Sequence, residues 1–192
     1  MIGCGYTGNN IVNRLAHLGL EGGKTVAIND DDQHLALIEA DRKILIKKRP
    51  SRPGKSGNHE VERAVDESTR CILEESLKDT DMVFVTADTS GGTGTKVASI
   101  AAEISKQMGA IVAVMVTFPF HDYGTEISIA EGELDALRRN ADTLIIMDNN
   151  RLLPYLPLEE IFSVVDQIIA ETIKGITETI TQPSLIIVNR NT

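Results

Sequence analysis

Apolar residues in this chain gather in short continuous runs that alternate with longer stretches of helical spacing. A continuous apolar run of about four to eight residues is typical of a strand that is covered on both faces. Apolar residues three and four positions apart predict an amphipathic helix with one buried face. The pattern predicts strands at 24–29, 43–46, 82–86, 110–117, 143–147 and 185–188, and helices at 10–18, 33–40, 59–78, 96–108, 127–139 and about 158–181.

The regular alternation of strands and helices favours consecutive βαβ units with right-handed crossovers. We therefore expect a single α/β domain over 1–192, with a doubly wound, mostly parallel sheet, helices on both faces and a Rossmann-like architecture. Ligands of such folds bind at the carboxyl ends of the strands. Only Met1 and Ile2 precede the first glycine, so we also expect the chain to lack most of its first strand.

Composition narrows the class of protein. Hydrophobic residues make up 42% of the chain, which is ample for a folded core and excludes a disordered protein. The net charge of -9 argues against nucleic-acid binding, because phosphate backbones repel an acidic surface. The two cysteines, Cys4 and Cys71, cannot form a disulfide framework or a four-ligand metal site. No apolar run approaches the roughly 20 residues of a transmembrane helix, and we expect a cytoplasmic protein.

The first candidate for ligand binding is a glycine loop at 3–8, with the spacing G-x-G-x-x-G. Such a loop makes a tight turn, allows close approach of a phosphate, and opens a helix whose free N–H groups attract anions. Acidic residues follow the next predicted strand, at 30–32, where a ribose contact is expected. Taken alone, this loop indicates a nicotinamide-type dinucleotide site.

A second glycine-rich loop, Ser90–Thr95, also lies between a predicted strand and a predicted helix. Its backbone N–H groups can form an anion-binding nest, and its threonine hydroxyls can donate hydrogen bonds. A dinucleotide-binding fold needs only one such loop. Two loops at neighbouring strand ends therefore favour a di- or triphosphate that is held from two sides.

The long helix near the end of the chain carries a candidate base-binding pair, Phe162 and Asp166, at i, i+4 spacing on one face. An aromatic ring can stack on a purine. A carboxylate can accept hydrogen bonds from the N1–H and 2-amino groups of guanine, whereas adenine would leave the carboxylate without a partner. For Phe162, packing in the core is an equally strong alternative.

The motif SGGTGT at 90–95 resembles the glycine-rich signature of the tubulin/FtsZ family. Further segments are similar to that family in order and spacing, at 2–15, 24–30, 81–88, 116–120, 141–152 and 162–168. Within the family, the chain is similar to the FtsZ-like cell-division GTPases of prokaryotes, and of archaea in particular. The resemblance implies a domain that binds GTP or GDP, with Mg²⁺ only as a companion of GTP and with no other metal site.

The resemblance also assigns roles to individual residues. It implies phosphate contacts from one set of positions and guanine or ribose contacts from another. The phosphate set is Gly5, Tyr6, Gly8, Asn9, Gly91, Gly92, Thr93, Gly94 and Thr95, and the guanine and ribose set is Asn29, Asn149, Phe162 and Asp166.

Several positions depart from the family pattern. Tyr6 stands where the family usually has glycine, and Ser90 and Lys96 replace glycines that flank the second loop. Tyr123 and Ile127 stand where the family typically has a glutamate and an arginine that contact the nucleotide, which leaves the ribose side unassigned.

The family hydrolyses GTP between head-to-tail subunits, with acidic residues from a loop after the long helix. By alignment, those positions are Asn189 and Thr192, and neither can act as a carboxylate base. We therefore expect impaired hydrolysis, and a long helix at about 158–181 that leads towards a second domain absent from this chain. Two alternatives are a GTP/GDP-binding module that neither polymerises nor hydrolyses, and a NAD-binding Rossmann protein.

Overall fold

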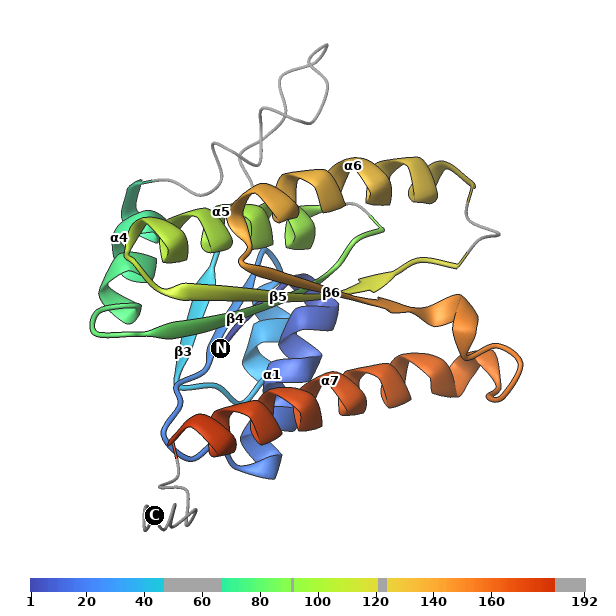
Figure 1. Ribbon diagram of the computed structural model, residues 1–192, viewed down its shortest axis with the longest axis horizontal. Coiled ribbons are helices and arrows are strands. Elements are labelled where there is room, and N and C mark those ends of the chain that lie inside the picture. Colours follow the sequence, from blue (N-terminus) through green and yellow to red (C-terminus); the bar gives the residue numbers. More distant parts are fainter. Residues whose placement is uncertain (47–66, 91, 121–123, 182–192) are drawn as a thin grey trace, which may run out of the picture.

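The computed structural model describes residues 1–46, 67–90, 92–120 and 124–181, and within these ranges the chain forms a parallel sheet of six strands (Figure 1). The strand order is β3-β2-β1-β4-β5-β6, and every neighbouring pair is parallel. This confirms the predicted doubly wound α/β fold. The strands are β1 (Ile2–Cys4), β2 (Val26–Asn29), β3 (Arg42–Leu45), β4 (Met82–Asp88), β5 (Ile111–Phe118) and β6 (Thr143–Asp148).

Helices cover both faces of the sheet, which gives three layers. In Figure 1, α5 and α6 lie above the sheet, α4 stands at its left end, and α1 and α7 lie below it. The helices are α1 (Gly5–Leu18), α2 (Asp32–Leu37), α4 (Glu67–Ser76), α5 (Thr93–Gln107), α6 (Gly124–Asn140) and α7 (Leu158–Thr181), with a 3₁₀ turn at Asn149–Arg151. Among the helices of the described ranges, none has both the length and the apolar character that a bilayer crossing requires.

The apolar runs of the central strands divide between two cores. On β4, Val83, Val85 and Ala87 belong to the cluster beneath α5 and α6, whereas Phe84 belongs to the cluster shared with α1 and α7. The side chains of a strand alternate between its two faces, so a strand buried on both faces needs an apolar residue at every position. The continuous hydrophobic runs in the sequence follow from this requirement.

The strand order places a topological switch point in the middle of the sheet, between β1 and β4. The connection after β1 continues through α1 to β2 on one side, and the connection after β4 continues through α5 to β5 on the other side. Crossovers leave in opposite directions there, and open α/β sheets bind their ligands in the crevice at such a point. Both glycine loops lie at this point.

Three expectations about element bounds need correction. Gly3 and Cys4, which were expected in the first glycine loop, belong to the three-residue strand β1, which pairs with β2 and β4. Helix α1 begins at Gly5 and not at Asn10, because the glycine loop runs directly into the helix. Helix α2 ends at Leu37, since Ile38 has extended backbone angles. The expected helix residues 59–66 and the expected strand 185–188 lie outside the described residues.

Candidate nucleotide-binding site

The two glycine loops are in direct backbone contact. A Cβ atom on Gly5 would lie 2.8 Å from Cα of Gly94, and a Cβ atom on Gly94 would lie 3.1 Å from the backbone oxygen of Cys4. Gly5 also has a φ of +70°, which side chains other than glycine rarely adopt. Glycine is therefore required where the loops meet, and both loops serve a single site.

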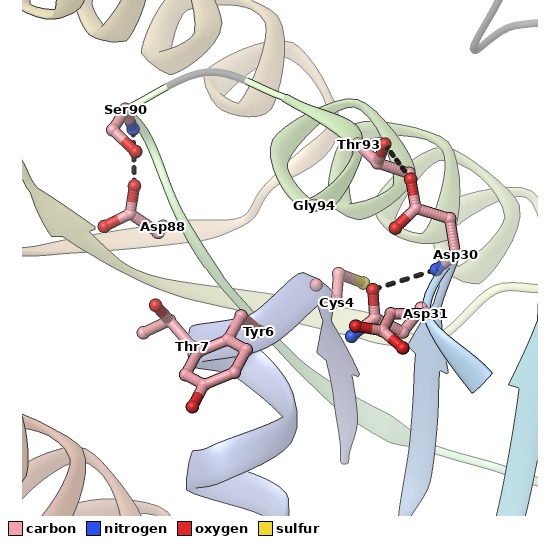
Figure 2. A pocket seen from close by; sticks show the side chains of 11 residues that line it. Cys4, Tyr6, Thr7, Asp30, Asp31, Asp88, Ser90, Thr93 and Gly94 are labelled. Atoms are coloured by element: carbon pink, nitrogen blue, oxygen red, sulfur yellow. Dashed lines mark hydrogen bonds between the residues drawn. The ribbon is translucent and has the colours of Figure 1, made fainter. Parts of the chain in front are cut away.

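A cavity of about 410 Å³ lies above this contact (Figure 2). The N-termini of α1 and α5 border it, and neither helix has an acidic residue in its first turn. The partial positive charge of the two helix ends is therefore available to an anion. The lining residues are Cys4, Gly5, Tyr6, Thr7, Asn29, Asp30, Asp31, Asp88, Ser90, Thr93 and Gly94.

Three carboxylates in the cavity wall hold the loops in place. Asp88 accepts hydrogen bonds from the backbone N–H of Ser90 (2.6 Å) and from the hydroxyl of Thr117 (2.7 Å). Asp31 accepts from two backbone N–H groups and caps α2. Asp30 accepts from the hydroxyl of Thr93 at 2.6 Å, which joins the loop after β2 to the second glycine loop (Figure 2).

Some residues of the predicted phosphate set have structural contacts instead of facing the cavity. The Asn9 side chain is fully buried and bonds to β2, donating to the backbone oxygen of Ile28 (3.2 Å) and accepting from its N–H (3.1 Å). The hydroxyl of Thr95 donates to the backbone oxygen of Asp88 at 2.5 Å. Gly8 allows α1 to approach the backbone of β4. The side chains of Asn9 and Thr95 therefore support the loops from behind.

A second cavity, of about 440 Å³, lies between α1 and α7. It is lined by Asn10, Asn13, Arg14, His17, Leu18, Asp166 and Gln167. Asp166 is only 6% exposed, and burial raises the pKa of its carboxyl to about 7, against the opposing effect of Arg14 and with a further contribution from Asp88. Asn10 of this cavity bonds to His34, which in turn bonds to Asn29 and stacks on Tyr6 of the first cavity, so the two cavities are neighbours.

Arg14 spans the groove between the helices. Its guanidinium donates to Gln167 Oε1 at 3.1 Å and to Ser163 Oγ at 2.6 Å, both on α7. These bonds hold α7, the helix that carries Asp166, against α1. Sequence reasoning missed Asn10 and Arg14, although their i, i+4 spacing on α1 places both on the face that contacts α7.

The remaining predicted base-binding residues are separate from this second cavity. Phe162 is 49% exposed and contacts Phe120 edge-to-face, with ring centroids 5.6 Å apart, so burial in the core does not explain it. Asn149 is buried, and its Oδ1 has no hydrogen-bond partner among the described residues. Asn29 lines the first cavity, but its side chain bonds to Asp30 and His34.

Other residues of the predicted site fall outside the residues that the structure describes. Gly91 of the second loop is one of them. Tyr123, which stands where the family typically has a glutamate, is another. Asn189 and Thr192, at the expected catalytic-loop positions, also lie beyond the described ranges.

The chain belongs to the tubulin/FtsZ family. Residues 1–157 match the model of the Tubulin/FtsZ family GTPase domain. This confirms the resemblance that the sequence motifs indicated.

Known relatives extend the match over almost the whole chain. The chain is 50% identical to cell division protein FtsZ 2 of Halobacterium salinarum over 97% of its length, and 48% identical to FtsZ 2 of Methanocaldococcus jannaschii over the same share. A structure of an empty FtsZ dimer from M. jannaschii superimposes with a TM-score of 0.83 at 40% identity, over 96% of this chain and 55% of that one. The chain spans about half the length of these curated relatives, 48% and 50% of them.

Proposed function

We propose that this chain is the guanine-nucleotide-binding domain of an FtsZ-like protein that assembles head to tail. The observation that carries the proposal is the contact between two glycine loops at the switch point of the sheet, next to a second cavity that contains Asp166. The first cavity holds the phosphates, and the second holds the edge of the base.

The backbone provides most of the phosphate binding. The first turns of α1 and α5 direct N–H groups and partial positive charge towards the first cavity, and their glycines let a phosphate approach the main chain. The Thr93 hydroxyl, which donates to Asp30 in this structure, is available to a phosphate oxygen if it leaves that partner. The negative charges of Asp30 and Asp88 repel a phosphate. Nucleotide binding therefore depends on the partial positive charge of the helix ends and on a counterion that offsets this repulsion.

Mg²⁺ fits this site only together with the nucleotide. Among the described residues, no three His, Cys, Asp or Glu side chains are grouped so that they could hold a metal ion by themselves. Carboxylates such as Asp30 and Asp88 are nevertheless the hard oxygen donors that Mg²⁺ prefers beside phosphates. When bound, the ion would neutralise phosphate charge next to these side chains.

Asp166 provides the preference for guanine. Its ionised carboxylate can accept from both the N1–H and the 2-amino group, and each hydrogen bond to a charged group contributes about 1.5–3 kcal/mol. Adenine presents an acceptor at N1 and has no 2-amino group, so it would leave the buried carboxylate without partners. A NAD-binding function has less support, because one glycine loop suffices for a dinucleotide and the Asp166 cavity has no role in it.

We further propose that this chain hydrolyses GTP poorly. The support is the type of residue at the two expected catalytic-loop positions, because Asn189 and Thr192 have no carboxylate to activate water. GTP turnover measured at rising protein concentration should stay near background. A steep, cooperative rise in turnover would contradict this part of the proposal and leave the proposal of nucleotide binding intact.

The binding proposal is tested by calorimetric titration of the chain with GDP, GTP, ATP and NAD. We expect both guanine nucleotides to bind at least tenfold more tightly than ATP, with no saturable binding of NAD. Asp166→Asn should remove most of this preference, because an amide offers only one acceptor to guanine. Equal affinity of the wild-type chain for ATP and GTP would overturn the assignment of Asp166.

A further inference from the structure

Tyr6 places an aromatic ring at the edge of the phosphate cavity. Its side chain is 67% exposed although it lies inside a glycine loop, so packing in the core does not explain it. The ring stacks on His34, with centroids 4.1 Å apart and planes inclined by 22°. In Figure 2 the Tyr6 ring lies on the α1 side of the cavity, across from Thr93 and Asp30.

His34 is a rigid support for this ring. Asn29 accepts the N–H of Asp30 with its Oδ1 (2.8 Å), so it is the Nδ2 of Asn29 that donates to Nδ1 of His34, at 3.0 Å. The ring proton is then on Nε2, which donates to Oδ1 of Asn10 at 3.2 Å. Burial lowers the pKa of His34 below its usual value, in agreement with a neutral ring in one fixed tautomer.

Tyr6 and His34 link the two cavities, because the Tyr6 ring stacks on His34, and His34 bonds to Asn10 of the second cavity. Tyr6 lines the first cavity, and Asn10, one helical turn further along α1, lines the second. Residues at i and i+4 share a helix face. A nucleotide with its phosphates in the first cavity and its base at Asp166 in the second would therefore have its sugar close to Tyr6.

We propose that Tyr6 recognises the ribose of the bound nucleotide, through a hydrogen bond between its phenol and a sugar hydroxyl, and that His34 positions the Tyr6 ring. This inference rests on the proposed nucleotide-binding function. A phenol can both donate to and accept from a hydroxyl, and the stack on His34 limits the directions in which it points.

The test compares GDP with 2′,3′-dideoxy-GDP, which lacks both sugar hydroxyls, by calorimetric titration of the full chain. One neutral hydrogen bond corresponds to roughly 2- to 10-fold in affinity, so the wild-type chain should prefer GDP by that factor. Tyr6→Phe should lose that factor for GDP and bind the dideoxy ligand as the wild type does. Tyr155→Phe is the matched control, because Tyr155 is 81% exposed and lines neither cavity.

The role of His34 has its own readout. His34→Ala should bring the ratio of the affinity for GDP to the affinity for 2′,3′-dideoxy-GDP towards one. In a chain that already carries Tyr6→Phe, the same substitution should leave this ratio unchanged. A merely structural role would weaken both ligands equally and leave the ratio unchanged. Circular dichroism melts establish that each variant is folded before it is titrated.

Other outcomes separate the two proposals. If GDP binds but the wild-type ratio is one, or if Tyr6→Phe leaves the ratio unchanged, the assignment of the ribose to Tyr6 is overturned and the proposed function stands. If the folded wild-type chain binds neither GDP nor GTP, the proposed function fails, and the ribose assignment fails with it.

Discussion

At the scale of single residues, the chemistry of Asp166 is set by the two helices that bury it. The carboxylate lies between α1 and α7 and is largely buried, so its ionised form is disfavoured and its pKa is raised to about 7. Arg14 opposes this shift but also bonds to Gln167 and Ser163. Asp166 thus titrates near neutral pH, and two predictions follow from its ionisation.

The first prediction concerns nucleotide affinity and pH. If Asp166 binds guanine as proposed, it does so as the ionised carboxylate, and proton binding to Asp166 competes with nucleotide binding below a pH of about 7. GDP should therefore bind roughly tenfold more weakly at pH 6 than at pH 8, as expected for a single competing proton. Calorimetric titration across this range measures the change in affinity. Asp166→Asn is the control, because any pH dependence of GDP affinity that remains in this variant arises from the phosphates of the nucleotide. A wild-type profile that matches that of the variant would contradict this prediction.

The second prediction concerns stability without nucleotide. The folded-state pKa of Asp166 lies above its unfolded value of 3.8, so unfolding releases a proton between about pH 4 and pH 7 and the free energy of unfolding falls as pH rises through this window. Asp166→Asn removes this loss. The variant should be more stable than the wild type at pH 8, by up to roughly 4 kcal/mol, and similar to it near pH 4. Urea denaturation at both pH values is the measurement.

At the scale of secondary-structure elements, the close approach of α1 to β4 brings the first glycine loop beside the second. A Cβ atom on Gly8 would lie 2.4 Å from the backbone oxygen of Thr86, a distance that real side chains do not adopt. The absence of a side chain at Gly8 therefore sets the separation of α1 from β4. That separation decides whether Gly5 can reach Gly94.

The third prediction tests this approach with a pair of matched substitutions. Gly8→Ala should destabilise the chain by about 1–3 kcal/mol and weaken nucleotide binding, because the methyl group pushes α1 away from β4. Gly132→Ala, in the open middle of α6, should stabilise it by about 0.5–1 kcal/mol, since no atom lies within 4 Å of the new methyl group. Denaturant unfolding of both variants measures these free energies. Equal changes in the free energy of unfolding would contradict the packing argument.

At the scale of the whole molecule, one site draws on both halves of the sheet. The first glycine loop follows β1, the second follows β4, and the second cavity lies between α1 and α7. A ligand that binds all of these parts stabilises the folded state as a unit. Such stabilisation is a thermodynamic consequence of binding to the folded chain alone.

The fourth prediction follows from this linkage. GDP at 100 times its dissociation constant should add about 2.7 kcal/mol to the free energy of unfolding, which corresponds to a rise of roughly 5 to 10 °C in Tm for a chain of this size. Differential scanning calorimetry with GDP, and with ATP at the same concentration, measures it. An equal rise with ATP would show that phosphate binding alone produces the effect.

Much of this architecture could be predicted from the sequence. The continuous apolar runs identified β4 and β5, because strands buried on both faces need apolar side chains throughout. The glycine loops were predicted because their spacing reflects local backbone geometry. Helical spacing likewise predicted that Phe162 and Asp166 lie on one long helix, although only Asp166 lines the second cavity. These features depend on interactions between residues that are close along the chain.

Only the tertiary structure decided which of these residues line a cavity. Asn9 and Asn10 are neighbours in the sequence, yet the first is buried against β2 and the second lines the cavity that contains Asp166. The stack of Tyr6 on His34 joins residues from different loops. Local sequence determines the elements and their turns, whereas contacts between distant segments depend on how closely helices pack on the sheet, a distance set here by glycines and buried side chains.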